Sequence, residues 1–193
     1  MIRMATTQDI PAILEIYGPY VQNTTCSFEY QVPDMETFSL RFQTVTKQFP
    51  WLVWEEGGQV LGYAYGSLPF SRSAYQWCCE VSIYIAPQGQ KKGIGRKLYA
   101  VLEALLWQQG YQVIYSLVTS ENENSLAFHY HMGYRLVAEL PGCGVKHGKR
   151  LGVTWLEKRQ ETDTLPTKPP VSWRDIVENN EKLTNILDTL SLS

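Results

Sequence analysis

The pattern of hydrophobic and polar positions predicts a chain in which helices and strands alternate. Apolar residues at helical spacing, such as Ile10, Ile13, Leu14 and Tyr17, predict amphipathic helices. Alternating runs rich in β-branched and aromatic residues, such as Val81 to Ile85, predict strands. The predicted helices cover about 6–17, 35–47, 95–109 and 122–132. The predicted strands cover 2–5, 51–55, 60–65, 75–85, 112–118, 134–140 and 150–157, and no internal repeat is present.

Short polar signals set the expected boundaries of these elements. Thr6 and Asp9 have the spacing of a capping box, which predicts a helix beginning there. Ser120 and Glu123 predict the cap of a later helix in the same way. The pair Gly57-Gly58 between two strand-like runs predicts a tight hairpin turn.

A glycine-bearing loop between a strand and a helix is the most informative stretch. Glycine allows close approach of backbone N–H groups to a ligand, and a helix N-terminus adds partial positive charge, so the loop suits a pyrophosphate. It lacks the Gly-Lys-Ser/Thr of a phosphate-binding P-loop and the three glycines of a dinucleotide fingerprint. Glycine pairs and solvated basic runs are common, so the loop alone leaves phosphate binding and a solvated turn equally open. Its residues are Gln90, Lys91, Lys92, Gly93, Ile94, Gly95 and Arg96.

The composition is that of an ordinary globular protein. The 193 residues carry a net charge of −2, with 44% hydrophobic and 19% charged residues, so we expect no general affinity for nucleic acid. No signal peptide and no apolar run of membrane-spanning length is visible, which predicts a cytoplasmic protein without a membrane partner. The cysteines and histidines show no metal-ligand spacing, and no metal or disulfide framework is expected.

Two motifs in chain order resemble those of the GCN5-related N-acetyltransferase (GNAT) family. The loop Gln90 to Gly95 resembles that family's Gln/Arg-x-x-Gly-x-Gly/Ala loop, and Asn122-x-x-Ser125-x-x-Phe128-His129 resembles its second cofactor-side helix. The resemblance spans residues 1–160. It implies a mixed α/β (α+β) GNAT fold, with a mostly antiparallel twisted central sheet flanked by helices. It also implies acetyl-CoA as the co-substrate.

Within that family, the chain is most similar to the phosphinothricin/methionine-sulfone N-acetyltransferases. Their run Arg-x-x-Tyr…Val-Glu-x-Ser-x-Tyr-Val resembles the segment from Arg72 to Ile85, and their Gly-x-Lys-x-Gly motif resembles 144–148. The chain departs from them at Arg150 and Gly152, which replace an aromatic and an acidic residue, and at the pair Cys78-Cys79. The first departure bears on the identity of the acceptor rather than on the chemistry.

The resemblance and the strand alternation together suggest site residues. Glu80 is expected to be the general base, although a strand glutamate of this kind is often only solvent-facing. His129 falls at the family's thiol-protonating tyrosine, with a partly buried structural histidine as the equal alternative. Cofactor binding is expected from the 90–96 loop and from Ile83, Tyr84, Ile85 and Asn122. Substrate binding is expected from Arg72, Ser73, Tyr75 and Ser82.

The chain after residue 160 reads as an appendage. Residues 161–171 form a Pro/Thr linker, and 172–193 predict an amphipathic helix with Trp173, Ile176, Leu183, Ile186, Leu187 and Leu190 on one side. We expect this helix to dock on its own domain or on the partner subunit of a homodimer.

Two classes of function remain open from the sequence. The first is an N-acetyltransferase that acts on the amine of a small amino-acid-like acceptor of the phosphinothricin or methionine sulfone/sulfoximine type. The second is a non-catalytic GNAT module that binds CoA. A GNAT enzyme acting on protein N-termini or aminoglycosides is a further alternative.

Overall fold

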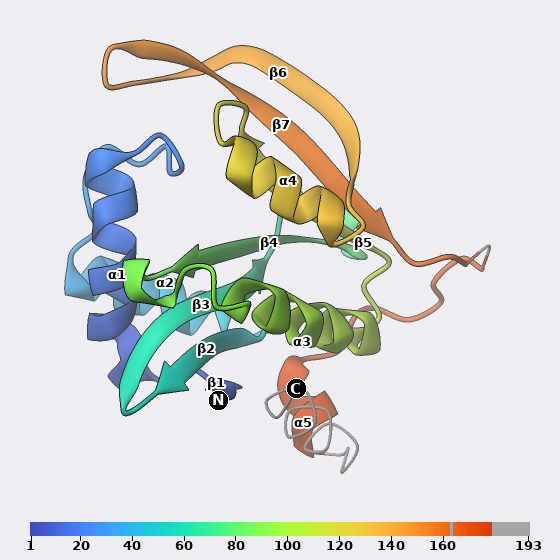
Figure 1. Ribbon diagram of the computed structural model, residues 1–193. Coiled ribbons are helices and arrows are strands. Elements are labelled where there is room, and N and C mark those ends of the chain that lie inside the picture. The colour runs from blue at the N-terminus through green and yellow to red at the C-terminus, as the bar shows by residue number, and fades with distance from the viewer. Residues whose placement is uncertain (163, 179–193) are drawn as a thin grey trace.

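A single seven-stranded sheet organises the molecule in this computed structural model, which describes residues 1–162 and 164–178 (Figure 1). The strand order is β1-β2-β3-β4-β5-β7-β6, and every neighbouring pair is antiparallel except β4 and β5. The strands are β1 (Ile2–Met4), β2 (Trp51–Glu56), β3 (Gln59–Ser67), β4 (Cys78–Ile85), β5 (Val113–Thr119), β6 (Arg135–Lys146) and β7 (Lys149–Arg159). The predicted mixed fold with a mostly antiparallel sheet is confirmed.

Helices cover the two faces of this sheet. They are α1 (Ile10–Asn23), α2 (Met35–Val45), α3 (Ile94–Gln109), α4 (Glu123–His131) and the short α5 (Trp173–Glu178). The first two helices pack on one face of β2 and β3, around the buried rings of Phe38, Trp51 and Tyr63. The helix α3 packs on the other face, and α4 adds Leu126 and Phe128 to the same core.

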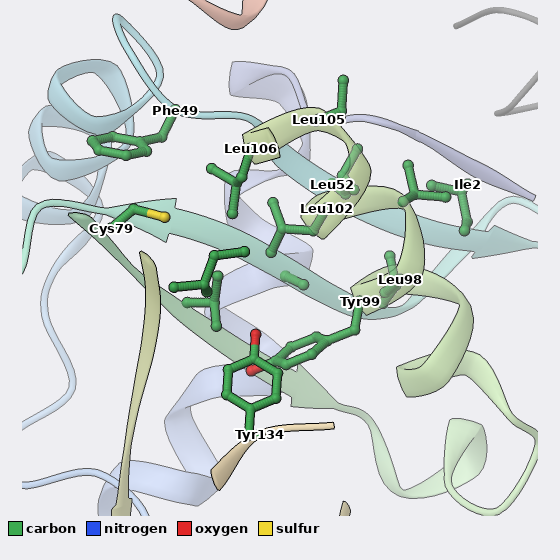
Figure 2. Close-up of a cluster of buried hydrophobic side chains, with 14 of the residues drawn as sticks. Ile2, Phe49, Leu52, Cys79, Leu98, Tyr99, Leu102, Leu105, Leu106 and Tyr134 are labelled. Atoms are coloured by element: carbon green, nitrogen blue, oxygen red, sulfur yellow. The ribbon is translucent and has the colours of Figure 1, made fainter. Parts of the chain in front are cut away.

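The core between α3 and the sheet is a direct product of helical spacing. Leu98, Leu102, Leu105 and Leu106 are each at most 1% exposed and belong to one buried cluster, and Figure 2 shows Leu102 and Leu106 pointing from α3 toward the strands. Cys79 of β4 points into the same core, whereas Cys78 before it lies outside the core cluster. The helix ends at Gly110, whose φ of 99° is the left-handed conformation expected of a glycine cap.

The strands β4 and β5 are paired along only part of their length. These strands pair only where Cys78, Cys79 and Glu80 meet Val113 to Tyr115, and they then diverge. Because β3 continues to pair with β4 as far as Ile85, only the edge of β4 that faces β5 is left open. The sheet is thereby divided into two parts that are joined by one short parallel ladder.

Several predicted boundaries differ from the structure for identifiable reasons. The strand expected from residue 75 begins at Cys78, because Ser73–Tyr75 form a 3-10 turn. The cap of α4 is Asn122 rather than Ser120, since the Asn122 side chain accepts a hydrogen bond from the Ser125 backbone N–H.

The last two strands are longer than predicted. The stretch after Leu140, which lies outside the predicted strands, is a strand irregularity that contains Gly142 at a φ of 63°. The hairpin then turns at His147-Gly148, where both residues have positive φ. By contrast, the turn at Gly57-Gly58 has the positive φ values of 59° and 78° that the predicted tight hairpin requires.

A buried lysine fixes this long hairpin to the rest of the domain. Lys146, near the tip of β6, is 2% exposed, and its Nζ donates hydrogen bonds to the backbone oxygens of Val21 and Ser27 at 2.7 and 2.6 Å. The nearby Tyr30 hydroxyl donates to the Val145 oxygen. The hairpin and the α1–α2 loop therefore form one wall.

The appendage docks on its own domain as far as the structure describes it. No helix or strand forms between 160 and 172 among the described residues, yet this segment is anchored by side chains of the domain. Gln109 donates a hydrogen bond to the Val171 oxygen at 2.7 Å, and the Trp173 indole donates to the Thr46 oxygen at 2.9 Å. Ile176 packs on the α3 core, while Leu183, Ile186, Leu187 and Leu190 lie outside the described residues.

Candidate active site

A cleft opens where β4 and β5 diverge. It has a volume of about 570 Å³ and is walled by both strands, the loop before α3, and α4. The predicted cofactor residues that line it are Ile83, Tyr84, Ile85, Gln90, Lys91, Gly93, Ile94, Gly95, Arg96 and Asn122. Ser82 and His129 line it as well. The fold thus brings Ser82 and His129, which are 47 positions apart in the sequence, to one cleft.

Backbone donors on β4 point into this cleft. The N–H of Ala86 donates to the Leu61 oxygen on β3 at 2.9 Å, and the β3–β4 register is continuous. Because N–H direction alternates along a strand, those of Ile83 and Ile85 face the open edge. The N–H of Tyr84 faces β3 instead, and its ring packs against two tyrosines of α1. Ile83 and Ile85 therefore offer the donors that an amide-bearing arm requires.

The loop before α3 forms the wide end of the cleft. Lys91 and Gly93 adopt left-handed φ values of 60° and 76°, which turn the chain sharply into α3. The N–H groups from Gly93 through the first helical turn have no intrahelical acceptor, and the helix dipole adds positive potential. Ile94 is 1% exposed, so it can serve a ligand through its backbone only. This cradle fits a pyrophosphate.

Lys92 and Gly95, two residues of this loop, contribute differently to the cleft. Lys92 does not line the cleft, and its Nζ lies 3.7 Å from Glu56 Oε1 of β2. A Cβ on Gly95 would lie 3.4 Å from the Ile83 side chain and 3.6 Å from the Phe128 ring. These are ordinary contact distances, so the glycine keeps the cleft wide rather than preventing a clash.

Glu80 lies on the opposite face of β4, at the point where the strands begin to diverge. Burial raises the pKa of its carboxyl above the ordinary value, and its carboxylate has no hydrogen bond or ion pair within the described part of the chain. Its neighbours on this face include Tyr115 of β5 and Ser82, which is paired with Tyr65 across the β3–β4 ladder. An unpaired carboxylate of raised pKa is suited to accept a proton.

The loop that carries Arg72, Ser73 and Tyr75 lies beside this face. All three residues are exposed, and the Tyr75 ring lies 4.6 Å from that of Phe70. Phe70 also stacks on Trp155 of β7 at 5.8 Å, so the loop forms an aromatic wall with the sheet. The Trp155 indole nitrogen is buried and has no partner among the described residues.

Hydrogen-bonding groups surround both ring nitrogens of His129, the most distant being Ser125 Oγ at 3.4 Å from Nδ1. Its Nδ1 lies 2.7 Å from the Ser125 backbone oxygen, which can only accept, so Nδ1 carries the proton. Its Nε2 lies 2.9 Å from the Tyr99 hydroxyl and 2.8 Å from Ser116 Oγ. Burial lowers the pKa of this imidazole, which keeps it neutral. The arrangement favours Nε2 as an acceptor over the proton-donating role expected from the sequence.

Asn122 has two local partners. Its side-chain oxygen caps α4, and its Nδ2 lies 3.1 Å from Cys26 Sγ. The expected bond to the pantetheine arm stays a prediction.

Sequence reasoning missed the residues that have no motif around them. Tyr20, Cys26, Tyr99 and Ser116 all line the cleft, but helix and strand periodicity gives them no distinctive signal. One signal was available for Ser116, which is a hydroxyl in an otherwise apolar position of β5.

Other kinds of site find no support in the described residues. They contain no group of three potential metal ligands among His, Cys, Asp and Glu. None of the helices in residues 1–162 and 164–178 combines the length and apolarity needed to cross a membrane.

Comparisons with known proteins agree with this geometry. The family model described as "Acetyltransferase (GNAT) domain" matches residues 2–155. A phosphinothricin N-acetyltransferase from Alcaligenes faecalis is 34% identical over 162 residues, covering 81% of this chain and 81% of the relative. An L-methionine sulfoximine/L-methionine sulfone acetyltransferase from Salmonella typhimurium is 31% identical over 166 residues, covering 86% and 97%.

A solved structure gives the same result in three dimensions. The phosphinothricin acetyltransferase from Sinorhizobium meliloti in complex with AcCoA matches at a TM-score of 0.84 and 32% identity, covering 88% of this chain and 94% of that one. The family model covers most of the chain, and the relatives match over most of their own length. The chain therefore belongs to the GCN5-related N-acetyltransferase (GNAT) family of acetyl-CoA-dependent enzymes.

Proposed function

We propose that this enzyme transfers the acetyl group of acetyl-CoA to the α-amine of a small amino-acid-like acceptor, of the phosphinothricin or methionine sulfone/sulfoximine type. The observation that carries the proposal is the placement of Glu80. Its carboxylate, which has no hydrogen bond or ion pair among the described residues, stands at the divergence of β4 and β5, on the face opposite the pyrophosphate cradle. The two substrates can thus meet through the gap between the strands.

The relatives' activities support this choice of acceptor. Proteins that match over 81% or more of their own length act, by name, on phosphinothricin and on methionine sulfoximine or sulfone. All of these are small amino acids with a polar group on the side chain. The aromatic wall of Phe70, Tyr75 and Trp155 gives such a side chain an apolar surface beside Glu80, and the buried Trp155 indole offers a donor.

Arg72 is the cation that we assign to the acceptor's carboxylate. It is exposed and has no ion pair among the described residues, in the same loop as the aromatic wall. A guanidinium suits bidentate capture of a carboxylate. A free arginine beside a general base would select acceptors that carry an acid next to the amine.

The reaction needs three groups in order. Glu80 takes a proton from the acceptor ammonium, directly or through a water, which frees the nitrogen lone pair. The nitrogen then attacks the thioester carbon, and the open N–H groups of β4 hydrogen-bond the carbonyl oxygen as it becomes negative. The tetrahedral intermediate loses the second nitrogen proton to solvent, the C–S bond breaks, and CoA leaves as the thiolate.

A mass-spectrometric screen of acceptors with acetyl-CoA tests the proposal. We expect N-acetyl products from phosphinothricin, methionine sulfone or methionine sulfoximine. The matched controls are the decarboxylated amines of the same side chains, which lack the group that Arg72 would hold. Product from a peptide N-terminus or an aminoglycoside, and from none of the amino acids, would contradict this acceptor class. Binding of acetyl-CoA without any product would favour the non-catalytic module.

We further propose that the enzyme acts as a cytoplasmic homodimer. Its four cysteines are unpaired, which suits a reducing compartment. Apolar side chains stand exposed along the edge strand β6, and a second copy would cover them; they are Leu136, Val137, Leu140 and Val145. Light scattering checks the assembly, and a mass of one chain across micromolar concentrations would contradict it.

A further inference from the structure

The apex of the cleft contains a hydroxyl that the expected site residues do not include. Ser116 follows Tyr115, the last residue of β5 that pairs with β4, and its side chain points toward α3 and α4. It is 3% exposed, yet it lines the cleft together with Tyr99 and His129. The narrow end of the wedge between β4 and β5 is therefore polar, although the strand around it is apolar.

At this apex, Nε2 of His129 can accept a hydrogen bond from only one of two nearby hydroxyls, so the imidazole does not require the proton of the other. The proton on Nδ1 of His129 is committed to the Ser125 oxygen, so Nε2 has a single lone pair to offer. Two hydroxyls lie within hydrogen-bond distance of it, those of Tyr99 and Ser116. Only one of them can donate fully to Nε2. Both residues line the cleft, but the Tyr99 ring is packed against Phe128 and Tyr134, whereas the small Ser116 side chain can change rotamer, so the hydroxyl that can turn to a ligand is that of Ser116.

The direction in which acetyl-CoA enters places its sulfur at this hydroxyl. The pyrophosphate cradle forms the wide end of the cleft, and the open edge of β4 runs inward from it to Val81. An arm that follows this edge reaches the apex with its thioester, because the strands pair beyond that point. We propose that Ser116 Oγ–H hydrogen-bonds the thioester sulfur as the C–S bond breaks, which makes Ser116 a catalytic residue of the acetyl transfer proposed above.

The step balances without transfer of the serine proton. Glu80 takes the first proton of the acceptor ammonium, the neutral nitrogen forms the C–N bond and releases its second proton to solvent, and the C–S electron pair moves to sulfur. Ser116 stabilises the resulting thiolate by a charge-assisted hydrogen bond, and the thiolate takes its proton from solvent on release. His129 and Tyr99 are positioning residues that fix the serine rotamer.

Kinetics of matched serine variants test the assignment. Ser116→Ala should lower kcat by about 10- to 100-fold, the range expected for loss of a hydrogen bond to a developing charge. Ser116→Thr should recover most of the activity, because it restores the hydroxyl. Ser120→Ala is the control, since that hydroxyl bonds Thr154 at 3.0 Å and does not line the cleft. A kcat for Ser116→Ala equal to that of the wild type would overturn the proposal.

A second measurement reads the contact with sulfur directly. The thiol of bound CoA is titrated through the ultraviolet absorbance of its thiolate, with the S-ethyl thioether of CoA as the blank. The thiol pKa should be lower on the wild type than on Ser116→Ala, and equal values would overturn the proposal. Because this measurement uses CoA without an acceptor, it tests the role of Ser116 even if no acceptor for the enzyme is found. Enzyme that gains one acetyl group at Ser116 would show a nucleophile, which also contradicts the donor role.

Discussion

Replacing Glu80 by glutamine is the sharpest test of the chemistry. The amide keeps the shape of the side chain, and because the carboxylate has no partner among the described residues, the change breaks no ion pair there. Loss of general-base help typically lowers the rate by about 10²–10⁴-fold, which is about 2.7–5.4 kcal/mol of transition-state stabilisation. We expect that loss in kcat/KM for the acceptor at neutral pH.

The pH dependence distinguishes a lost base from a damaged fold. Wild-type kcat/KM should rise with pH and level off above the pKa of Glu80, which burial raises above the ordinary 4.5. The variant should lack that step, and its deficit should shrink at high pH, where more of the acceptor amine is already neutral. Stability should change in the opposite direction. A carboxyl with a raised folded-state pKa destabilises the protein as pH rises through that pKa, so Glu80→Gln should melt at a higher temperature than the wild type at pH 8.

The assay measures CoA release at saturating acetyl-CoA, with acetyl-CoA binding measured separately by calorimetry. Binding should be unchanged, because Glu80 does not line the cofactor cleft. The control is Glu139→Gln, an exposed glutamate on β6, which should behave as the wild type. Full activity in Glu80→Gln, or a rate deficit that is constant with pH, would refute the role of Glu80.

Four further changes have defined outcomes. Gly93→Val forces a branched residue to a φ of 76°, which costs about 1–2 kcal/mol and should raise the KM for acetyl-CoA about 5- to 30-fold; unchanged acetyl-CoA affinity would remove this turn from the cradle. Arg72→Ala should weaken amino-acid acceptors in steady-state assays and leave their decarboxylated amines unaffected; equal losses for both would take Arg72 out of the site. Truncation after Gln160 should lower the melting temperature by several degrees, because it removes the α5 contacts with the α3 core; an unchanged Tm would show that the docking adds no stability. Burial alone would raise the pKa of Asp9, but hydrogen bonds from Arg3 and Thr6 lower it, so its contribution to stability is present above the unfolded-state pKa and falls away in acid; Asp9→Asn should therefore flatten the acid side of the stability curve measured by denaturant titration.

Much of the fold could be predicted because its signals are local. The stripe on α3, the turn at Gly57-Gly58 and the capping box at Thr6 each depend on a few neighbouring residues, and each appears in the structure. The extra length of the last hairpin was missed because it depends on a strand irregularity at Gly142, which lies outside the predicted strands.

The candidate site divides in the same way. The glycine loop and Glu80 could be located from motif and alternation, whereas the polar apex could not. Ser116, Tyr99 and His129 come from β5, α3 and α4, and only the packing of these elements brings their polar atoms within 2.9 Å. Sequence spacing carries no information on such a meeting of three elements. It also left the acid and structural roles of His129 equally open, because the carbonyl that fixes the tautomer, that of Ser125, is identified only in the structure.

The short parallel ladder between β4 and β5 has a consequence for the local opening motions of the protein. Three residue pairs form the whole backbone ladder between the two parts of the sheet, so local opening of the strands along this line should break few backbone hydrogen bonds. Acetyl-CoA that binds between β4 and β5 would hydrogen-bond the open edge of β4 as a neighbouring strand does, and would oppose this opening. Amide hydrogens of Ile83 and Ile85 should then exchange fast in the free enzyme and slowly in the complex. The co-substrate would thus complete the sheet that binds it.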